Sequence, residues 1–150
     1  MSLPDPSTLV PHQGDALLLE TIDAVRPDGL DASLHVRSHA PFARDDGALP
    51  AWMGPEIMAQ AVSAFATWRQ GPPYRPKPGL LLGVRRYASD LDAFEDGARL
   101  TVTVRESTRD ESGIAVFDSV LSMNGTEVAQ GMLTVFQPEH VLETLAEQLA

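Results

Sequence analysis

One long stretch with helical periodicity, residues 52–70, limits the folds open to this chain more than any other segment. Gly54 and Pro55 suit the first turn of a helix, and Gly71 followed by two prolines ends it. Between these signals, apolar side chains cover nearly the whole helical circumference. A helix that is apolar on almost every side is buried on almost every side. We therefore expect a central helix that the rest of the chain encloses.

Four polar residues interrupt this helix, at spacings that place all of them on one stripe: Glu56, Gln60, Ser63 and Thr67. The only charge among the four, Glu56, lies at the N-terminal end. A buried carboxyl group is costly unless it is paired or neutralised, which makes Glu56 a candidate for acid–base chemistry. The alternative is a first-turn glutamate that stabilises the helix N-terminus.

Turn signals divide the rest of the chain into strand-like segments. Residues 30–37 alternate between apolar and polar side chains, and a Pro-Asp-Gly turn joins them to residues 17–25 as a hairpin. The pattern predicts a short amphipathic helix after Pro138. It predicts an α+β fold, with an antiparallel sheet wrapped around the long central helix, as a single domain over residues 1–150. After the long helix, four more strands are predicted in consecutive hairpin-like steps, at residues 80–91, 100–107, 114–123 and 128–136.

Composition excludes several kinds of function. The chain has 21 acidic and 11 basic residues and a formal net charge of −10, which argues against nucleic acid and anionic membrane surfaces as partners. It has no cysteine, so disulfides, thiolate metal sites and cysteine nucleophiles are excluded. No apolar stretch is long enough to span a bilayer, and no targeting segment is recognisable. We expect a cytoplasmic protein that does not bind membranes.

Histidine supplies a second candidate for proton transfer. His12 lies in a loop just ahead of the first predicted strand, and a histidine that faces a carboxylic acid can pair a general base with a general acid. The alternative for His12 is a solvated or structural loop residue. His35 and His39 fall on a strand and its following loop, roughly 13 Å apart, so we expect no metal site. The sequence has neither a phosphate-binding loop nor a dinucleotide fingerprint.

Two segments resemble motifs of the 3-hydroxyacyl-[acyl-carrier-protein] dehydratases. Residues 11–20, PHQGDALLLE, resemble the family pattern P-H-x-x-P-x-L-L-x-D, and residues 56–61, EIMAQA, resemble E-x-M-A-Q-A. Residues 82–84 and 94–97 fall where that family has a later strand and a P-G-D turn. The similarity is greatest to the branch found with aryl-polyene pigment biosynthesis. Asp15 departs from the pattern, because the family usually has proline at that place.

The resemblance implies a hotdog fold, a dimer or a larger oligomer of dimers with sites at the subunit interface, and no cofactor. His12 of one subunit would face Glu56 of the other. His12 would remove the C2 proton of a 3-hydroxyacyl thioester, and protonated Glu56 would donate to the departing C3 hydroxyl group. The products would be water and a trans-2-enoyl thioester. The backbone N–H of Ala51 would donate to the thioester carbonyl, and Gly54 and Gln60 would also contact the substrate.

The substrate implied by the resemblance is an acyl chain attached to acyl carrier protein. Three helix residues, Met58, Val62 and Phe65, are expected to shape the acyl tunnel. Carrier proteins of this kind are acidic, and so is this chain, so docking requires a local basic patch. The candidates for this patch lie near the end of the helix and on the strand after it: Arg69, Arg75, Lys77, Arg85 and Arg86.

Two other functions fit the same features. A hotdog thioesterase would use the helix carboxylate to hydrolyse the thioester with water, and it would not need His12. A non-catalytic hotdog subunit would shape a partner dehydratase, and His12 and Glu56 would then be vestigial. Geometry separates these interpretations, because dehydration requires the two side chains to approach within about one bridging water of each other.

Overall fold

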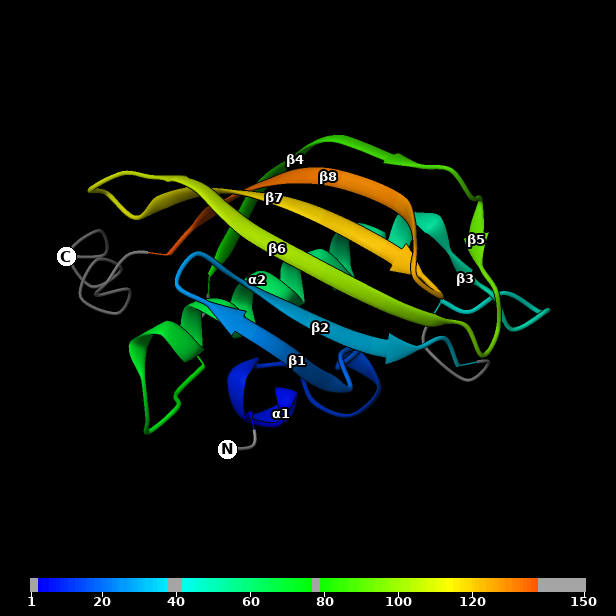
Figure 1. Ribbon diagram of the computed structural model, residues 1–150, viewed down its shortest axis with the longest axis horizontal. Coiled ribbons are helices and arrows are strands. Elements are labelled where there is room, and N and C mark those ends of the chain that lie inside the picture. The colour runs from blue at the N-terminus through cyan, green and yellow to red at the C-terminus, as the bar shows by residue number, and fades with distance from the viewer. Residues whose placement is uncertain (1–2, 38–41, 77–78, 138–150) are drawn as a thin grey trace, which may run out of the picture.

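The computed structural model describes residues 3–37, 42–76 and 79–137, and the short helix expected after Pro138 lies outside these ranges. A six-stranded sheet curves over one long helix, α2 (Gly54–Gln70) (Figure 1). Its strands are β1 (Thr21–Arg26), β2 (Gly29–His35), β4 (Leu80–Ser89), β6 (Arg99–Arg109), β7 (Ile114–Met123) and β8 (Thr126–Phe136). The smaller elements are α1 (Pro6–Leu9), the 3-10 turns η1 (Gly14–Ala16) and η2 (Ala51–Met53), and a separate sheet of β3 (Leu49–Pro50) and β5 (Ala93–Phe94).

The central helix is confirmed at the predicted place. η2 leads directly into α2, which has Pro55 in its first turn and ends at Gly71, where a φ of 81° favours glycine. Ile57, Ala61 and Phe65 have no exposed surface. The helix packs against β2, β6, β7 and β8 on its sheet side and against α1 elsewhere. This enclosure is what a helix with apolar residues on nearly every side requires.

The order of the strands corrects one prediction. Neighbours in the sheet run β1-β2-β6-β7-β8-β4, so β6, β7 and β8 form consecutive hairpins as predicted, but β4 does not pair with β6. β4, the first strand after the helix, pairs with β8, with Leu81 opposite Val135. β6 takes the place beside β2, with Leu30 opposite Val104. The reason is that α2 carries the chain across the inner face of the sheet, so β4 enters at the far edge and β6 closes the gap.

Alternating side chains join the sheet to the helix. Leu100 and Val102 of β6, and Phe117 and Leu121 of β7, are buried under the sheet. Phe117 meets Phe65 of α2 edge to face, with ring centroids 6.0 Å apart. Apolar side chains therefore alternate toward the helix along these strands. This alternation fixes the register of the sheet, because a slip of one residue would turn every apolar side chain to solvent.

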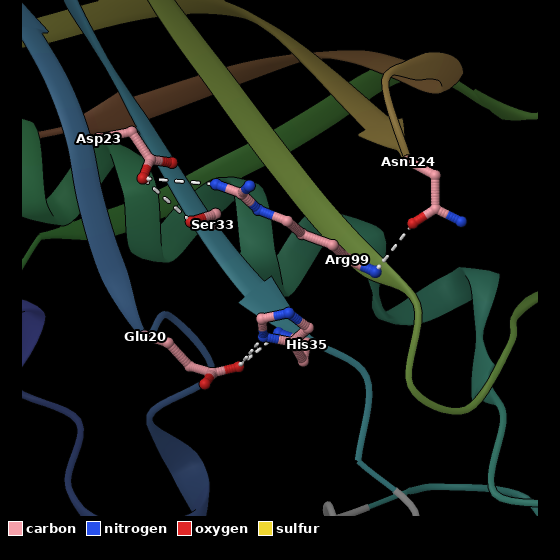
Figure 2. Close-up of polar contacts among 6 residues, drawn as sticks. All are labelled: Glu20, Asp23, Ser33, His35, Arg99 and Asn124. Carbon is pink, nitrogen blue, oxygen red and sulfur yellow. Dashed lines mark hydrogen bonds and ion pairs between the residues drawn. The ribbon is translucent and has the colours of Figure 1, made fainter.

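The face of the sheet opposite α2 carries polar side chains that link β1, β2 and β6 (Figure 2). Asp23 Oδ1 accepts a hydrogen bond from the Ser33 hydroxyl at 3.1 Å and lies 3.8 Å from Arg99 Nη2. Glu20 accepts from the backbone N–H of His35 and lies 3.5 Å from its Nδ1. Within the described ranges, no three histidine or acidic side chains are grouped so that they could hold a metal ion. None of the helices described there has the length and apolarity to cross a membrane.

Candidate active site

His12 and Glu56 meet within one chain. His12 Nε2 lies 3.3 Å from Glu56 Oε1, and the two side chains are 32% and 45% exposed. The distance is well within the limit of one bridging water. The arrangement differs from the expected one, in which the histidine of one subunit faces the glutamate of its partner. It differs also in burial, because Glu56 projects to the surface from the first turn of an otherwise buried helix.

Short elements near the N-terminus bring His12 to the helix. α1 is capped by the side chain of Asp5 and packs against α2. Leu9 and Val10, which are 0% and 1% exposed, anchor the chain in the core just before His12. Sequence reasoning missed α1, although an aspartate followed by proline is a recognisable start of a helix. The contact with Glu56 therefore depends on how α1 docks on α2.

Gln60, one turn along the helix from Glu56, connects the same two segments. It is fully buried. Its Oε1 accepts a hydrogen bond from the backbone N–H of Leu18 at 2.9 Å. Its Nε2 donates to the carbonyl of Ala16 at 2.8 Å and to Glu56 Oε1 at 3.2 Å. The amide is thus engaged by the protein on both sides, and its contact with substrate stays a prediction. It holds the loop after His12 on the helix and orients the carboxyl group.

The residues just before and at the start of α2 are likewise engaged by the protein. The Ala51 N–H donates to the Asp92 carbonyl at 2.9 Å, continuing the β3–β5 pairing, so it is not free for a thioester carbonyl as expected. The Ala51 carbonyl accepts from the Tyr87 hydroxyl. A Cβ on Gly54 would lie 2.1 Å from that hydroxyl oxygen, so Gly54 makes room for Tyr87 rather than for substrate. Burial raises the pKa of Tyr87, against an opposing hydrogen bond with Ser89, which favours the protonated hydroxyl that donates here.

A pocket of about 410 Å³ opens beside Glu56. Phe42 and Trp52, which are 65% and 61% exposed, form one wall and meet edge to face with ring centroids 5.5 Å apart. The lining residues are mostly apolar: Asp15, Ala16, Leu18, Phe42, Trp52, Met53, Pro55, Glu56 and Leu81. The residues predicted to shape an acyl tunnel are packed in the protein core instead, and none of them lines this pocket: Met58, Val62 and Phe65.

The arrangement is suited to proton transfer on an apolar substrate. An imidazole and a carboxyl group in contact can act as base and acid, and the adjoining pocket can enclose an apolar chain. The sequence singled out His12 and Glu56 but missed the aromatic wall. Phe42 lies in a predicted loop and Trp52 at a predicted helix start, where periodicity says nothing about exposure. Large aromatic residues in short segments rich in proline and alanine were the only available signal for them.

Comparison with known proteins places this geometry in a family. The ApeP-like family, described as ApeP dehydratase, matches residues 4–147. The solved structure of the dehydratase heterocomplex ApeI:P from Xenorhabdus doucetiae is 27% identical, with a TM-score of 0.84, and covers 96% of this chain and 97% of that chain. No curated protein matches the sequence.

More distant structures share the fold alone. A hypothetical thioesterase protein with coenzyme A from Streptococcus pneumoniae is 16% identical, with a TM-score of 0.59 and coverage of 77% of this chain and 82% of that chain. The phenylacetic acid degradation protein PaaI from Thermus thermophilus is 21% identical, with a TM-score of 0.60 and coverage of 82% and 96%. The predicted hotdog fold is confirmed by these structures together with the sheet around α2. Because the family match spans nearly the whole chain, this protein belongs to the ApeP-like dehydratase family.

Proposed function

We propose that the protein dehydrates a 3-hydroxyacyl thioester of acyl carrier protein to the trans-2-enoyl thioester. The observation that carries the proposal is the approach of His12 Nε2 to Glu56 Oε1, at 3.3 Å, beside an apolar pocket. His12 accepts the proton from C2 of the substrate, the C2–C3 double bond forms, and the C3–O bond breaks. Glu56 gives its proton to the departing hydroxyl group, so water leaves.

The pair of His12 and Glu56 needs only one proton between its two side chains to be ready for the reaction. Neutral His12 with protonated Glu56 holds the same number of protons as an imidazolium with a carboxylate, so the two states differ only by a proton shift between the partners. Substrate that enters the pocket displaces water around the pair and favours the neutral form. Gln60 donates a hydrogen bond to the same oxygen, Glu56 Oε1, and so helps to hold the carboxyl group beside His12.

The apolar wall supports an acyl substrate. Each methylene group that leaves water for such a surface contributes about 0.8 kcal/mol to binding. Trp52 and Phe42 present broad exposed rings for this contact, and Leu81 of β4 closes the other side. A thioesterase would find the same apolar surface useful, so the pocket alone does not favour dehydration. The contact between His12 and Glu56 does, because hydrolysis needs no histidine there.

Activity of paired variants tests the proposal. His12→Gln and Glu56→Gln are each expected to lower kcat by about 10²–10⁴-fold, the usual contribution of a positioned acid or base. His35→Gln and Glu20→Gln make the same chemical changes in the exposed contact on the outer face of the sheet and should leave the rate unchanged. The assay offers a 3-hydroxyacyl carrier-protein thioester and follows the enoyl product. Release of free thiol without enoyl product would establish hydrolysis and overturn the proposal.

A second hotdog subunit is proposed to pair along β4. This strand is an edge of the sheet, and its Leu80, Leu81 and Leu82 are 60%, 46% and 54% exposed. Leu81 also lines the pocket, so a subunit that covers β4 would also wall the site. We propose a homodimer, with mass twice 16.2 kDa in light scattering. Leu82→Lys is expected to give monomers. A monomeric wild-type protein that assembles only with a homologous chain would favour a heterocomplex instead, as in the ApeI:P structure.

Docking of an acidic carrier protein is proposed at exposed arginines near β4. Arg85 and Arg86 are adjacent and both exposed, because a bulge in the β4–β8 pairing interrupts the alternation there. Arg75 is also exposed. Arg69 does not belong to the patch, since it forms an ion pair with Glu106 at 3.1 Å. Lys77 lies outside the described residues.

Charge reversal tests this docking surface. Arg85→Glu combined with Arg86→Glu is expected to raise KM for the carrier-protein substrate and to leave KM for the same acyl group on coenzyme A unchanged. Arg109→Glu reverses another exposed arginine on β6 and is the control. An equal rise in KM for both substrates would place these arginines at the pocket, and no rise for either would overturn docking at this surface.

A further inference from the structure

The pocket beside Glu56 contains a second carboxylate that the proposed reaction does not use. Asp15 lies on η1, three residues after His12, and lines the pocket. It stands where the dehydratase pattern usually has proline, so the family resemblance gives it no role. Among the described residues it makes no side-chain hydrogen bond and no ion pair of the kind that holds Asp31 or Asp23. The described residues that line the pocket include no lysine or arginine to balance it.

The turn that carries Asp15 is fixed relative to Glu56. Within η1, the N–H of Leu17 donates to the Gly14 carbonyl at 3.1 Å. Ala16, the residue after Asp15, is held to α2 because its carbonyl accepts a hydrogen bond from Gln60 Nε2 at 2.8 Å. The same Gln60 side chain donates to Glu56. One buried amide therefore holds both the Glu56 carboxyl group and the backbone of the turn that carries Asp15. A flexible loop could move its charge away from an incoming ligand, but this turn is tied to the helix.

The negative charge of this pocket distinguishes acyl groups that carry a carboxylate from acyl groups that do not. Apolar walls lower the effective dielectric around any group bound between them, so charges interact there more strongly than in water. A ligand that brings its own carboxylate into the pocket meets Asp15 and Glu56, and the described residues of this chain that line the pocket include no lysine or arginine. The formal net charge of the whole chain, −10, adds to this repulsion. A neutral acyl chain packs against the aromatic and aliphatic wall without charge repulsion from Asp15.

We propose that Asp15 makes the site selective for uncharged acyl chains by excluding those that carry a carboxylate. The inference rests on the proposed function, since it assigns the substrate class for the same site. Asp15 acts on specificity and takes no part in proton transfer. Its substitution is expected to change the ratio of kcat/KM between two acyl groups.

Two matched substrates and two matched variants test the inference. The substrates are 3-hydroxyacyl thioesters of equal length, one ending in a methyl group and one in a carboxylate. Asp15→Asn is expected to raise kcat/KM for the carboxylate substrate relative to the methyl substrate by about tenfold, which corresponds to 1.4 kcal/mol. Asp118→Asn makes the same charge change on the outer face of β7 and should leave the ratio unchanged. High salt should weaken the wild-type preference, because it screens the repulsion.

Binding measurements separate this inference from the proposed reaction. Saturated acyl thioesters with the same two chain ends cannot be dehydrated, and their affinities are measured by titration calorimetry for wild type and both variants. If neither 3-hydroxyacyl substrate loses water, the proposed function fails. The ratio of the two ligand affinities measured by calorimetry still tests whether Asp15 excludes carboxylates. A ratio that Asp15→Asn leaves unchanged, or that Asp118→Asn shifts equally, would overturn the role of Asp15. Asp15 is exposed, so its variant is expected to fold, and circular dichroism checks this.

Discussion

Replacing Gln60 with leucine removes the buried amide that ties the N-terminal loop to the helix. Gln60 has no exposed surface, and its side chain serves three partners: the Leu18 N–H, the Ala16 carbonyl and Glu56 Oε1. Leucine has a similar volume and fits an apolar core, so Gln60→Leu deletes the hydrogen bonds without opening a large cavity. The change therefore isolates the contribution of this one amide to stability and to the geometry of the site.

The cost can be worked out contact by contact. Leu18 is 4% exposed, so its N–H loses a partner without gaining water, which costs about 1–3 kcal/mol. Ala16 and Glu56 are exposed, so water replaces the lost bonds there and each costs about 0.5–1 kcal/mol. The more apolar leucine side chain returns about 1 kcal/mol in the core. The net loss is about 1–4 kcal/mol in the free energy of unfolding.

Urea denaturation and thermal melting of the purified variant measure this loss. For a chain of this size, the expected loss lowers Tm by about 2–16 °C. Ser63→Ala is the control, because Ser63 lies on the same stripe of α2, half-buried, and its hydroxyl group makes none of the side-chain hydrogen bonds found among the described residues. The control should stay within about 0.5 kcal/mol of wild type. A Gln60→Leu protein as stable as Ser63→Ala would refute the idea that this amide holds the loop.

Two further changes probe the surroundings of the site and the sheet that supports it. Gly54→Ala places a Cβ 2.1 Å from the Tyr87 hydroxyl oxygen and is expected to cost about 1–3 kcal/mol in urea unfolding, whereas Gly83→Ala, in open space, should cost nothing; equal effects would contradict the close packing. Burial alone would raise the pKa of Asp31, but the bidentate contact with Arg26, a hydrogen bond from Thr103 and the charge of Arg105 together outweigh it and lower the pKa. A lowered folded-state pKa stabilises the protein above the unfolded value and loses that effect as the pH falls through the folded value. Asp31→Asn should therefore destabilise the protein at pH 7 by about 0.5–1 kcal/mol and have no effect at acidic pH below the lowered pKa, in paired unfolding curves; a cost that persists in acid would point to packing instead.

Local sequence patterns predicted the positions of the helices and strands with good accuracy, but they predicted less well which strands pair with each other. The helix at residues 52–70 and the strand Ile114–Met123 appear as expected, because apolar periodicity reflects the burial of each segment. The pairing of β4 with β8 was not predicted. Turn signals indicate where strands end, but the partner of a strand depends on the path of the chain between them. Here that path crosses the sheet with α2.

The residues of the candidate site were predicted from the sequence, but their contacts were not. The motif at residues 11–20 and the polar stripe of the helix predicted His12, Glu56 and Gln60 as candidate site residues. Their chemical types and spacing are properties of the sequence. The sequence could not predict that Gln60 serves the protein or that the Ala51 amide is taken by Asp92. A backbone N–H looks equally available at every position until its neighbours in space are known.

By itself, the sequence determined a buried central helix, an antiparallel sheet around it and a site with one histidine and one glutamate, because these follow from apolar periodicity and residue chemistry. The tertiary structure decided that His12 meets Glu56 within one chain, that Gln60 locks them together, and that an apolar pocket opens beside them. Such contacts join residues more than forty positions apart. They exist only because α1 and the loop after it pack on α2, and that packing is a property of the folded chain.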